Sequence, residues 1–117
     1  MTPNYYTKTV TIPAGATGLS AAVDLQNFAP VALIMPAAWQ TAVITAQASM
    51  DDVTYNNVYD DAGNERSLTV AVDRYITLSS SDLLACRYLK LRSGTAATPV
   101  DQTAARTITL VVKPMPS

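Results

Sequence analysis

Residues 42–65 read AVITAQASMDDVTYNNVYDDAGNE, and this stretch predicts the fold more directly than any other part of the chain. Ala42 to Ser49 has the length and composition of a strand, and Met50 to Thr54 those of a tight acidic turn. Tyr55 to Tyr59 is expected to return as a second strand, followed by a turn over Asp60 to Glu65 and a third strand. The stretch therefore predicts an antiparallel hairpin within a β protein.

Strand-like alternation of apolar and polar residues continues on both sides of this hairpin. It predicts further strands over Tyr6–Ile12, Leu19–Leu25, Val31–Met35, Arg66–Val72, Tyr75–Leu78, Arg87–Arg92 and Arg106–Lys113. In the strand over residues 87–92, Leu89 and Leu91 are expected to face inward, and Tyr88, Lys90 and Arg92 to form an exposed face.

These strands recur at intervals of about 8 to 12 residues with turn residues between them, a spacing typical of two packed antiparallel sheets. We expect one all-β domain over residues 1–117: a two-sheet, jelly-roll-like β-sandwich of eight or nine short strands. Ser80 or Ser81 is positioned to cap a short helix near residues 80–86, the single helix expected. An immunoglobulin-like strand order is the alternative, since patterning does not determine how strands connect.

Composition argues against several classes of function. The formal net charge is −1, so no broad electrostatic field favours nucleic acid or anionic lipid. The chain has no His, which removes the usual general base and the commonest metal ligand. Cys86 is the only Cys and is interpreted as a small buried apolar residue. Neither a signal peptide nor a membrane span is expected, and the sequence predicts neither an enzyme nor a cofactor.

Four aspartates, Asp51, Asp52, Asp60 and Asp61, lie on either side of the short strand over residues 55–59. Oxygen-rich turns of this kind can hold calcium, but the spacing does not match an EF-hand loop. Asp also favours turns because its side chain caps nearby backbone N–H groups. We favour the turn-forming role over a metal site.

Aromatic residues suggest two further kinds of surface. A platform on which sugar rings stack is one hypothesis, and its members would be Trp39, Tyr55, Tyr59, Tyr75 and Tyr88. The alternative is that Trp39 packs over one end of the sandwich and the tyrosines are half-buried. Tyr88, Lys90 and Arg92 interleave aromatic and basic groups, a pattern that favours a solvated face or a protein contact over nucleic acid.

Assembly is suggested by a long small-residue loop over residues 93–105 and by polar tails that carry apolar side chains. The candidate partner-binding residues are Tyr5, Tyr6, Trp39, Tyr88, Arg92, Pro99 and Met115.

The motifs ITAQASMDDVTYNNVYDDAGNE, RYITL and RYLKLRSGT resemble small proteins encoded among the virion structural genes of tailed bacteriophages, over roughly residues 30–112. The resemblance implies a non-enzymatic particle component made in the bacterial host cytoplasm, most simply a capsid decoration or head accessory protein that binds the major capsid protein. A neck or tail accessory protein is an alternative, and a homo-oligomer is compatible with each. The same motifs are also similar to carbohydrate-binding sandwiches, which implies a glycan-binding module as the other alternative.

Overall fold

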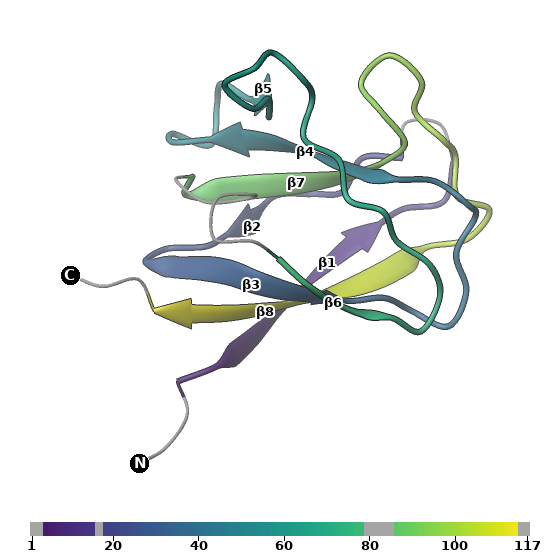
Figure 1. Cartoon of the computed structure of the whole chain (residues 1–117), viewed down its shortest axis with the longest axis horizontal. Helices are drawn as coiled ribbons and strands as arrows, with labels where there is room; N and C mark the ends of the chain where they lie inside the picture. The colour runs from purple at the N-terminus through teal and green to yellow at the C-terminus, as the bar shows by residue number, and fades with distance from the viewer. Residues whose placement is uncertain (1–3, 16–17, 79–85, 115–117) are drawn as a thin grey trace.

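The computed structural model describes residues 4–15, 18–78 and 86–114, and within these ranges it is all-β (Figure 1). The strands are β1 (Tyr6–Ile12), β2 (Val23–Asp24), β3 (Phe28–Ile34), β4 (Ile44–Ser49), β5 (Asn56–Asn57), β6 (Tyr75–Thr77), β7 (Tyr88–Ser93) and β8 (Arg106–Pro114). Except for Cys86, the short helix predicted near residues 80–86 lies outside the described residues.

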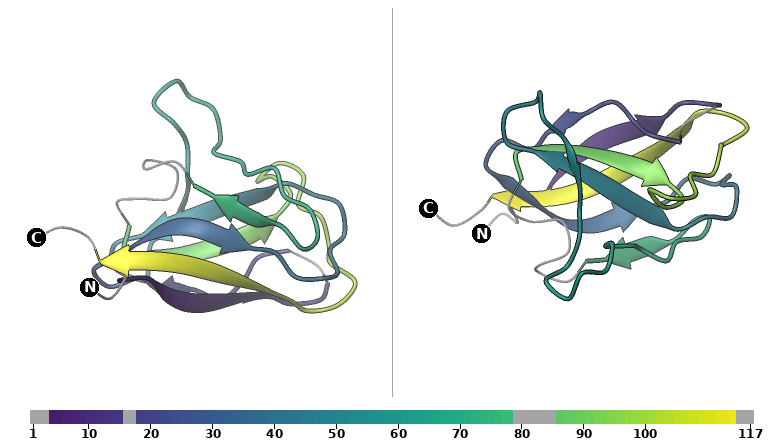
Figure 2. Two further views of the ribbon diagram at one scale, coloured as in Figure 1. Left: turned by 60° about the horizontal axis from the view of Figure 1, so that its bottom comes forward. Right: turned by 90° about the horizontal axis from the view of Figure 1, so that it is seen from above.

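The strands form two antiparallel sheets of four. Sheet 1 has the order β1-β8-β3-β6 and sheet 2 the order β2-β7-β4-β5, and the two pack face to face (Figure 2). The predicted two-sheet sandwich is therefore confirmed. The immunoglobulin-like alternative is wrong, because that fold pairs its first two strands in one sheet, whereas β1 and β2 lie in different sheets.

The core lies between the sheets and consists of alternate residues of the long strands. Ile108, Leu110 and Val112 of β8 face Leu89 and Leu91 of β7, and all five are fully buried. This alternation agrees with the sequence pattern and follows from the two-residue period of a strand. Burial of these apolar side chains is the main force that holds the sheets together.

Cys86 also belongs to this core, with 8% of its surface exposed. Burial raises the pKa of its thiol, because the charged thiolate is poorly solvated there. The interpretation of Cys86 as a buried apolar residue is confirmed.

Three of the predicted strands differ most from the structure. The predicted strand over residues 19–25 is reduced to β2 and that over residues 55–59 to β5. The strand predicted over Arg66–Val72 is wrong: within it Leu68 forms an isolated bridge, exchanging backbone hydrogen bonds of 3.0 and 2.8 Å with Ile44. The alternation of apolar and polar residues wrongly predicted a strand here, because the segment makes one bridge with β4 and then leaves the sheet edge. Val72 is therefore 43% exposed.

Candidate interaction surfaces

Sheet 2 presents an outer face of polar side chains. The register of β4 and β7 places Tyr88 opposite Ser49, Lys90 opposite Gln47 and Arg92 opposite Thr45. Tyr88, Lys90 and Arg92 thus share a face, as the sequence predicts. The expectation that this whole face is exposed is wrong, however, because Arg92 is only 6% exposed.

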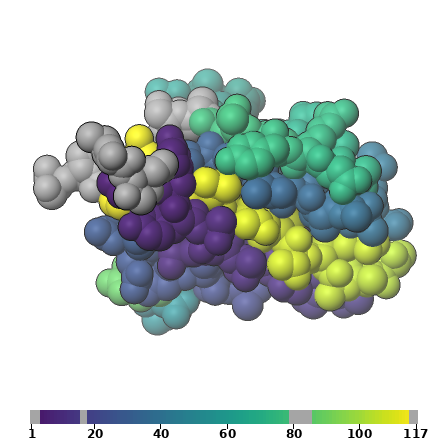
Figure 3. All heavy atoms as spheres, turned by 90° about the horizontal axis from the view of Figure 1, so that it is seen from below, coloured from purple at the N-terminus to yellow at the C-terminus, as the bar shows by residue number. Residues whose placement is uncertain are grey.

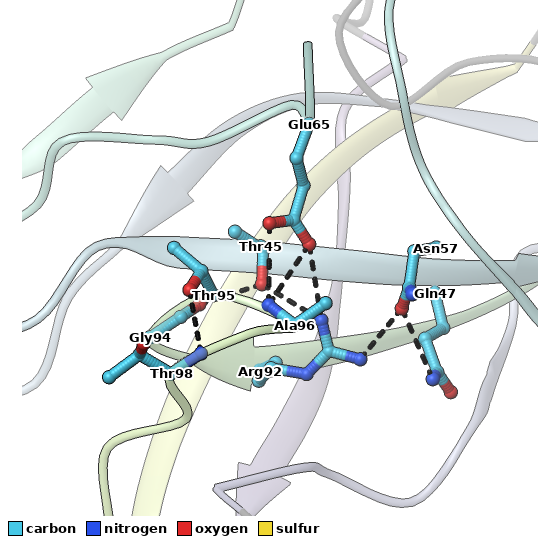
Figure 4. A network of polar contacts seen from close by, with 9 residues as sticks. All are labelled: Thr45, Gln47, Asn57, Glu65, Arg92, Gly94, Thr95, Ala96 and Thr98. Carbon is cyan, nitrogen blue, oxygen red and sulfur yellow. Dashed lines mark hydrogen bonds and ion pairs between the residues drawn. The ribbon is translucent and has the colours of Figure 1, made fainter. Parts of the chain in front are cut away.

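Arg92 is buried because it bonds two surface segments to sheet 2 (Figure 4). Its Nη1 lies 3.3 Å from Glu65 Oε2 and donates to Thr45 Oγ1 at 3.3 Å, while Nη2 donates to Asn57 Oδ1 at 2.8 Å. The Glu65 carboxylate also accepts from the backbone N–H of Ala96. The guanidinium therefore makes three hydrogen bonds within the chain, and Arg92 acts as a structural residue.

A pocket of about 210 Å³ adjoins this network and is lined by β4 and by residues 60 and 65–68. Its charged lining residues are Asp60, Glu65 and Arg66, so both signs are present. The Glu65 carboxylate is already engaged with Arg92 and Ala96. Because acidic and basic side chains are mixed in its lining, the pocket does not select for an anion or for a cation.

The basic residues at the other end of sheet 2 also contact other side chains of the chain. The Arg87 guanidinium lies 5.3 Å from the Tyr88 ring centroid and bonds Asp24 Oδ1 at 3.1 Å, which lowers the pKa of Asp24 and raises that of Arg87. Lys90 places its ammonium 4.2 Å from the Tyr55 ring centroid. Cations held in this way are poorly placed to form the row of phosphate contacts that nucleic acid requires.

Tyr55 is held at the edge of the same face. Desolvation, followed by the hydrogen bond that its hydroxyl donates to Asp52, raises the pKa of Tyr55 to about 12. Its hydroxyl therefore stays protonated near neutral pH and acts as a donor within the chain.

The turn aspartates close their own turns. Asp51 Oδ1 accepts hydrogen bonds from the backbone N–H groups of Val53 and Thr54 at 3.0 and 2.9 Å. Asp60 does the same in the next turn for residues 62 and 64. The turn-forming role is confirmed for these two residues. No group of three or more His, Cys, Asp or Glu side chains within the described ranges is arranged to hold a metal ion.

These bonds predict an acid-sensitive turn. Hydrogen bonds from Thr54, Val53 and Ser49 lower the pKa of Asp51, so the charged form is favoured in the folded state. Its stabilising effect is complete above the unfolded-state pKa and is lost as the pH falls through the lower folded-state pKa. We expect the melting temperature to fall as the pH drops below about 4, and to fall less steeply in Asp51→Asn.

The measurement is thermal unfolding by circular dichroism across that pH range. Asp61→Asn is the matched control, because Asp61 is an exposed aspartate in the neighbouring turn whose side chain accepts no hydrogen bond from a described residue. Equal pH profiles for Asp51→Asn and the wild type would contradict the prediction.

The outer face of sheet 1 is different in character. Residues paired across a strand ladder point to the same side, and the registers place twelve side chains there. We call this surface the threonine face, and it consists of Thr7, Thr9, Thr11, Ala29, Ala32, Ile34, Tyr75, Thr77, Thr107, Thr109, Val111 and Lys113. Lys113 is the single charged member. In Figure 3, β1, β8, β3 and β6 lie side by side on this surface.

A hollow of about 350 Å³ lies in the threonine face and extends to Tyr5 and Val31. Its lining includes Ala32 and Val111, which are 2% and 6% exposed, while Tyr5 and Tyr75 are 61% and 62% exposed. A recess with small apolar side chains and two exposed aromatic side chains suits an apolar or aromatic group of a protein partner.

The predicted partner-binding residues are not brought together. Tyr5 lines the hollow, whereas Tyr6 packs edge-on against Phe28 with ring centroids 5.3 Å apart. Tyr88 and Arg92 lie on sheet 2, and Pro99 is exposed in the loop where it pairs with Gly94. Met115 lies outside the described residues. Ala32, Thr77 and Val111 were not predicted as site residues, and the outward alternation in β8 is the sequence signal that could have indicated Val111.

The proposed aromatic sugar platform is not formed. Trp39 is half-buried against the core and its indole N–H donates to the carbonyl of Ala42 at 3.1 Å. Tyr75 belongs to sheet 1, whereas Tyr88 belongs to sheet 2 and Tyr59 to the segment paired with Glu65. The alternative in which Trp39 packs within the sandwich agrees with this placement.

Comparisons with protein-family models, with curated proteins and with solved structures find no match to this chain. Within the described ranges no helix has the length and apolarity that crossing a membrane requires.

Proposed function

We propose that the chain is a non-enzymatic structural component of a tailed-phage particle, a capsid decoration or head accessory protein that docks on the major capsid protein. The observation that carries the proposal is the threonine face, with its hollow beside the exposed rings of Tyr5 and Tyr75. Depletion of charge together with exposed aromatic side chains is typical of the centre of protein interfaces. The site of action that we propose is the virion.

The contrast between the two outer faces supports docking through sheet 1. On sheet 2, the charged groups of Asp24, Arg87, Lys90 and Arg92 all contact other side chains of the chain. On the threonine face, β-branched side chains lose little rotamer entropy when they are covered. A symmetric lattice multiplies such modest contacts through many identical copies.

The finer fold class that we propose is the jelly roll. Two observations support it: the sheets contain eight strands, and consecutive strands cross from one sheet to the other except at the β4–β5 hairpin. Jelly rolls occur in viral capsid and lectin domains, so this class is compatible with a particle protein. Because a fold does not determine function, the surface remains the stronger argument.

The first test is quantitative mass spectrometry of purified particles from the source phage or induced prophage. A ratio of this chain to the major capsid protein near equality would support capsid decoration. A ratio of a small fraction would instead support a vertex, neck or tail location. Absence from the particle would overturn the proposal.

The docking face is tested by charge insertion. We expect Tyr5→Asp/Tyr75→Asp to bind particles at least about tenfold more weakly, because each substitution puts a charge beside a surface that becomes desolvated on docking. Both tyrosines are more than half exposed, so the fold should be retained. The readout is rebinding of purified protein to particles that lack it.

The matched control for this experiment is Tyr59→Asp. Tyr59 is 56% exposed and pairs with Glu65 beside sheet 2, away from the threonine face. Equal loss of binding in the control and the double variant would show that added negative charge alone is responsible, and the docking face would have to be abandoned.

A further inference from the structure

The edge strands of the two sheets differ in length. The edge strands β2 and β5 of sheet 2 contain two residues each, and β6, at one edge of sheet 1, contains three. β1, at the other edge of sheet 1, contains seven residues. Short edge strands discourage pairing with another chain, whereas a long regular edge is a template for it.

The free edge of β1 is regular and has few features that would prevent it from pairing with another strand. Its ladder with β8 has no bulge, and no backbone hydrogen bond joins β1 to any other segment of the described chain. Lys8 is the one charged residue of the strand, and its ammonium lies 5.4 Å from the Phe28 ring centroid. The strand therefore carries a single charge, which disfavours only those pairings that bring another cation opposite it.

We propose that this edge pairs with the β1 strand of a second copy of the chain, antiparallel and across a two-fold axis at Thr9. The proposal goes beyond the proposed function and does not depend on it. It joins the two sheets 1 into one eight-stranded sheet and makes the threonine face continuous across both copies.

The register follows from length and charge. Centring on Thr9 pairs all seven residues of each strand, so that Thr7 faces Thr11 of the second copy and Lys8 faces Val10 of the second copy. A slip of the two-fold axis to Lys8 would place the two ammonium groups directly opposite one another, which is unfavourable. The Thr9 register therefore gives the longest ladder and avoids opposing like charges.

One hydrogen bond within the chain shows what the new ladder would repeat, and one exposed side chain shows what it would cover. Thr11 and Thr107 already share a hydrogen bond between their hydroxyl oxygens at 3.0 Å across β1 and β8, and threonines facing one another across the new edge can bond in the same way. Tyr6 is 51% exposed at the end of the strand and would lie opposite Ile12 of the second copy.

The test uses opposite charges at the two-fold axis. Analytical ultracentrifugation of the wild type across a concentration series is expected to show a monomer–dimer equilibrium. Thr9→Lys and Thr9→Asp should each raise the dimer dissociation constant at least about tenfold, because like charges meet across the axis. An equimolar mixture of the two variants should restore dimers, because opposite charges then meet.

The control is Thr107→Lys, which is exposed on the same face but separated from the interface by β1. It should dimerise as the wild type does, and circular dichroism of every variant verifies folding. A wild type that stays monomeric at its highest concentration, or dimers that Thr9 charges do not weaken, would overturn the proposal. Dimers lost in both single variants but not regained in the mixture would also contradict it.

Discussion

Arg92→Ala is expected to lower the free energy of unfolding by about 3–5 kcal/mol, because it leaves the largely buried carboxylate of Glu65 without its counter-charge. The Arg92 and Glu65 side chains are 7% and 16% exposed, so water replaces little of the lost interaction. Asn57 and Thr45 lose a hydrogen-bond donor in the same step. Since small domains are stable by only about 5–15 kcal/mol, Arg92→Ala should remove a large part of the free energy of unfolding.

Urea denaturation measures this loss, and Arg87→Ala is its control. Arg87 also pairs with a carboxylate, but its side chain and that of Asp24 are 49% and 38% exposed, and exposed pairs contribute about 0–1 kcal/mol. Arg92→Met/Glu65→Gln should regain much of the stability, because no charge is then buried alone. Equal losses in the two alanine variants would refute the structural role of Arg92.

Much of the fold could be predicted from local pattern. In β1, β7 and β8 one face is buried by the opposite sheet, so apolar residues such as Val10, Leu91 and Leu110 alternate with polar ones. The sequence keeps this alternation because a shift of the strand register by one residue would turn all its apolar side chains toward solvent. The existence and the inward faces of these three strands were therefore predictable from residue order alone.

The burial of Arg92 was not predictable in the same way. Alternation assigns a residue to a face, and it assigned Arg92 correctly to the outer face of sheet 2. Whether that face meets water depends on segments distant in sequence, here Glu65 and the loop that begins at Gly94. Long-range coverage of this kind leaves no local pattern, which is also why the segment over residues 66–72 resembles a strand without forming one.

The candidate docking surface was predicted only in part. Tyr5 was identified because it is an aromatic residue in a polar tail, but Ala32, Tyr75 and Val111 come from three different strands. Their proximity follows from the order β8-β3-β6, which connects distant parts of the chain and which strand patterning does not determine. A hollow made by three strands cannot be located until their order is known.

Gly94→Ala is expected to destabilise the protein by about 2–4 kcal/mol. Gly94 has φ +90°, a backbone conformation that costs a residue with a Cβ atom roughly 1 kcal/mol or more. A Cβ atom there would also lie 2.5 Å from the carbonyl oxygen of Thr98 and 2.6 Å from the backbone nitrogen of Val100. These are backbone atoms, so a rotamer change cannot relieve the overlap and the loop over residues 94–100 must move.

Gly63→Ala separates the two causes. Gly63 has nearly the same φ, +91°, but no heavy atom lies within 4 Å of the position that a Cβ atom would take there. Its substitution should cost only the backbone strain, about 1 kcal/mol. The difference between the two variants in urea denaturation measures the tightness of the loop at Gly94. Because Gly94 also accepts a 2.7 Å hydrogen bond from the Thr45 hydroxyl, that loop supports the Arg92 network, and similar losses in both variants would mean that it is loosely packed.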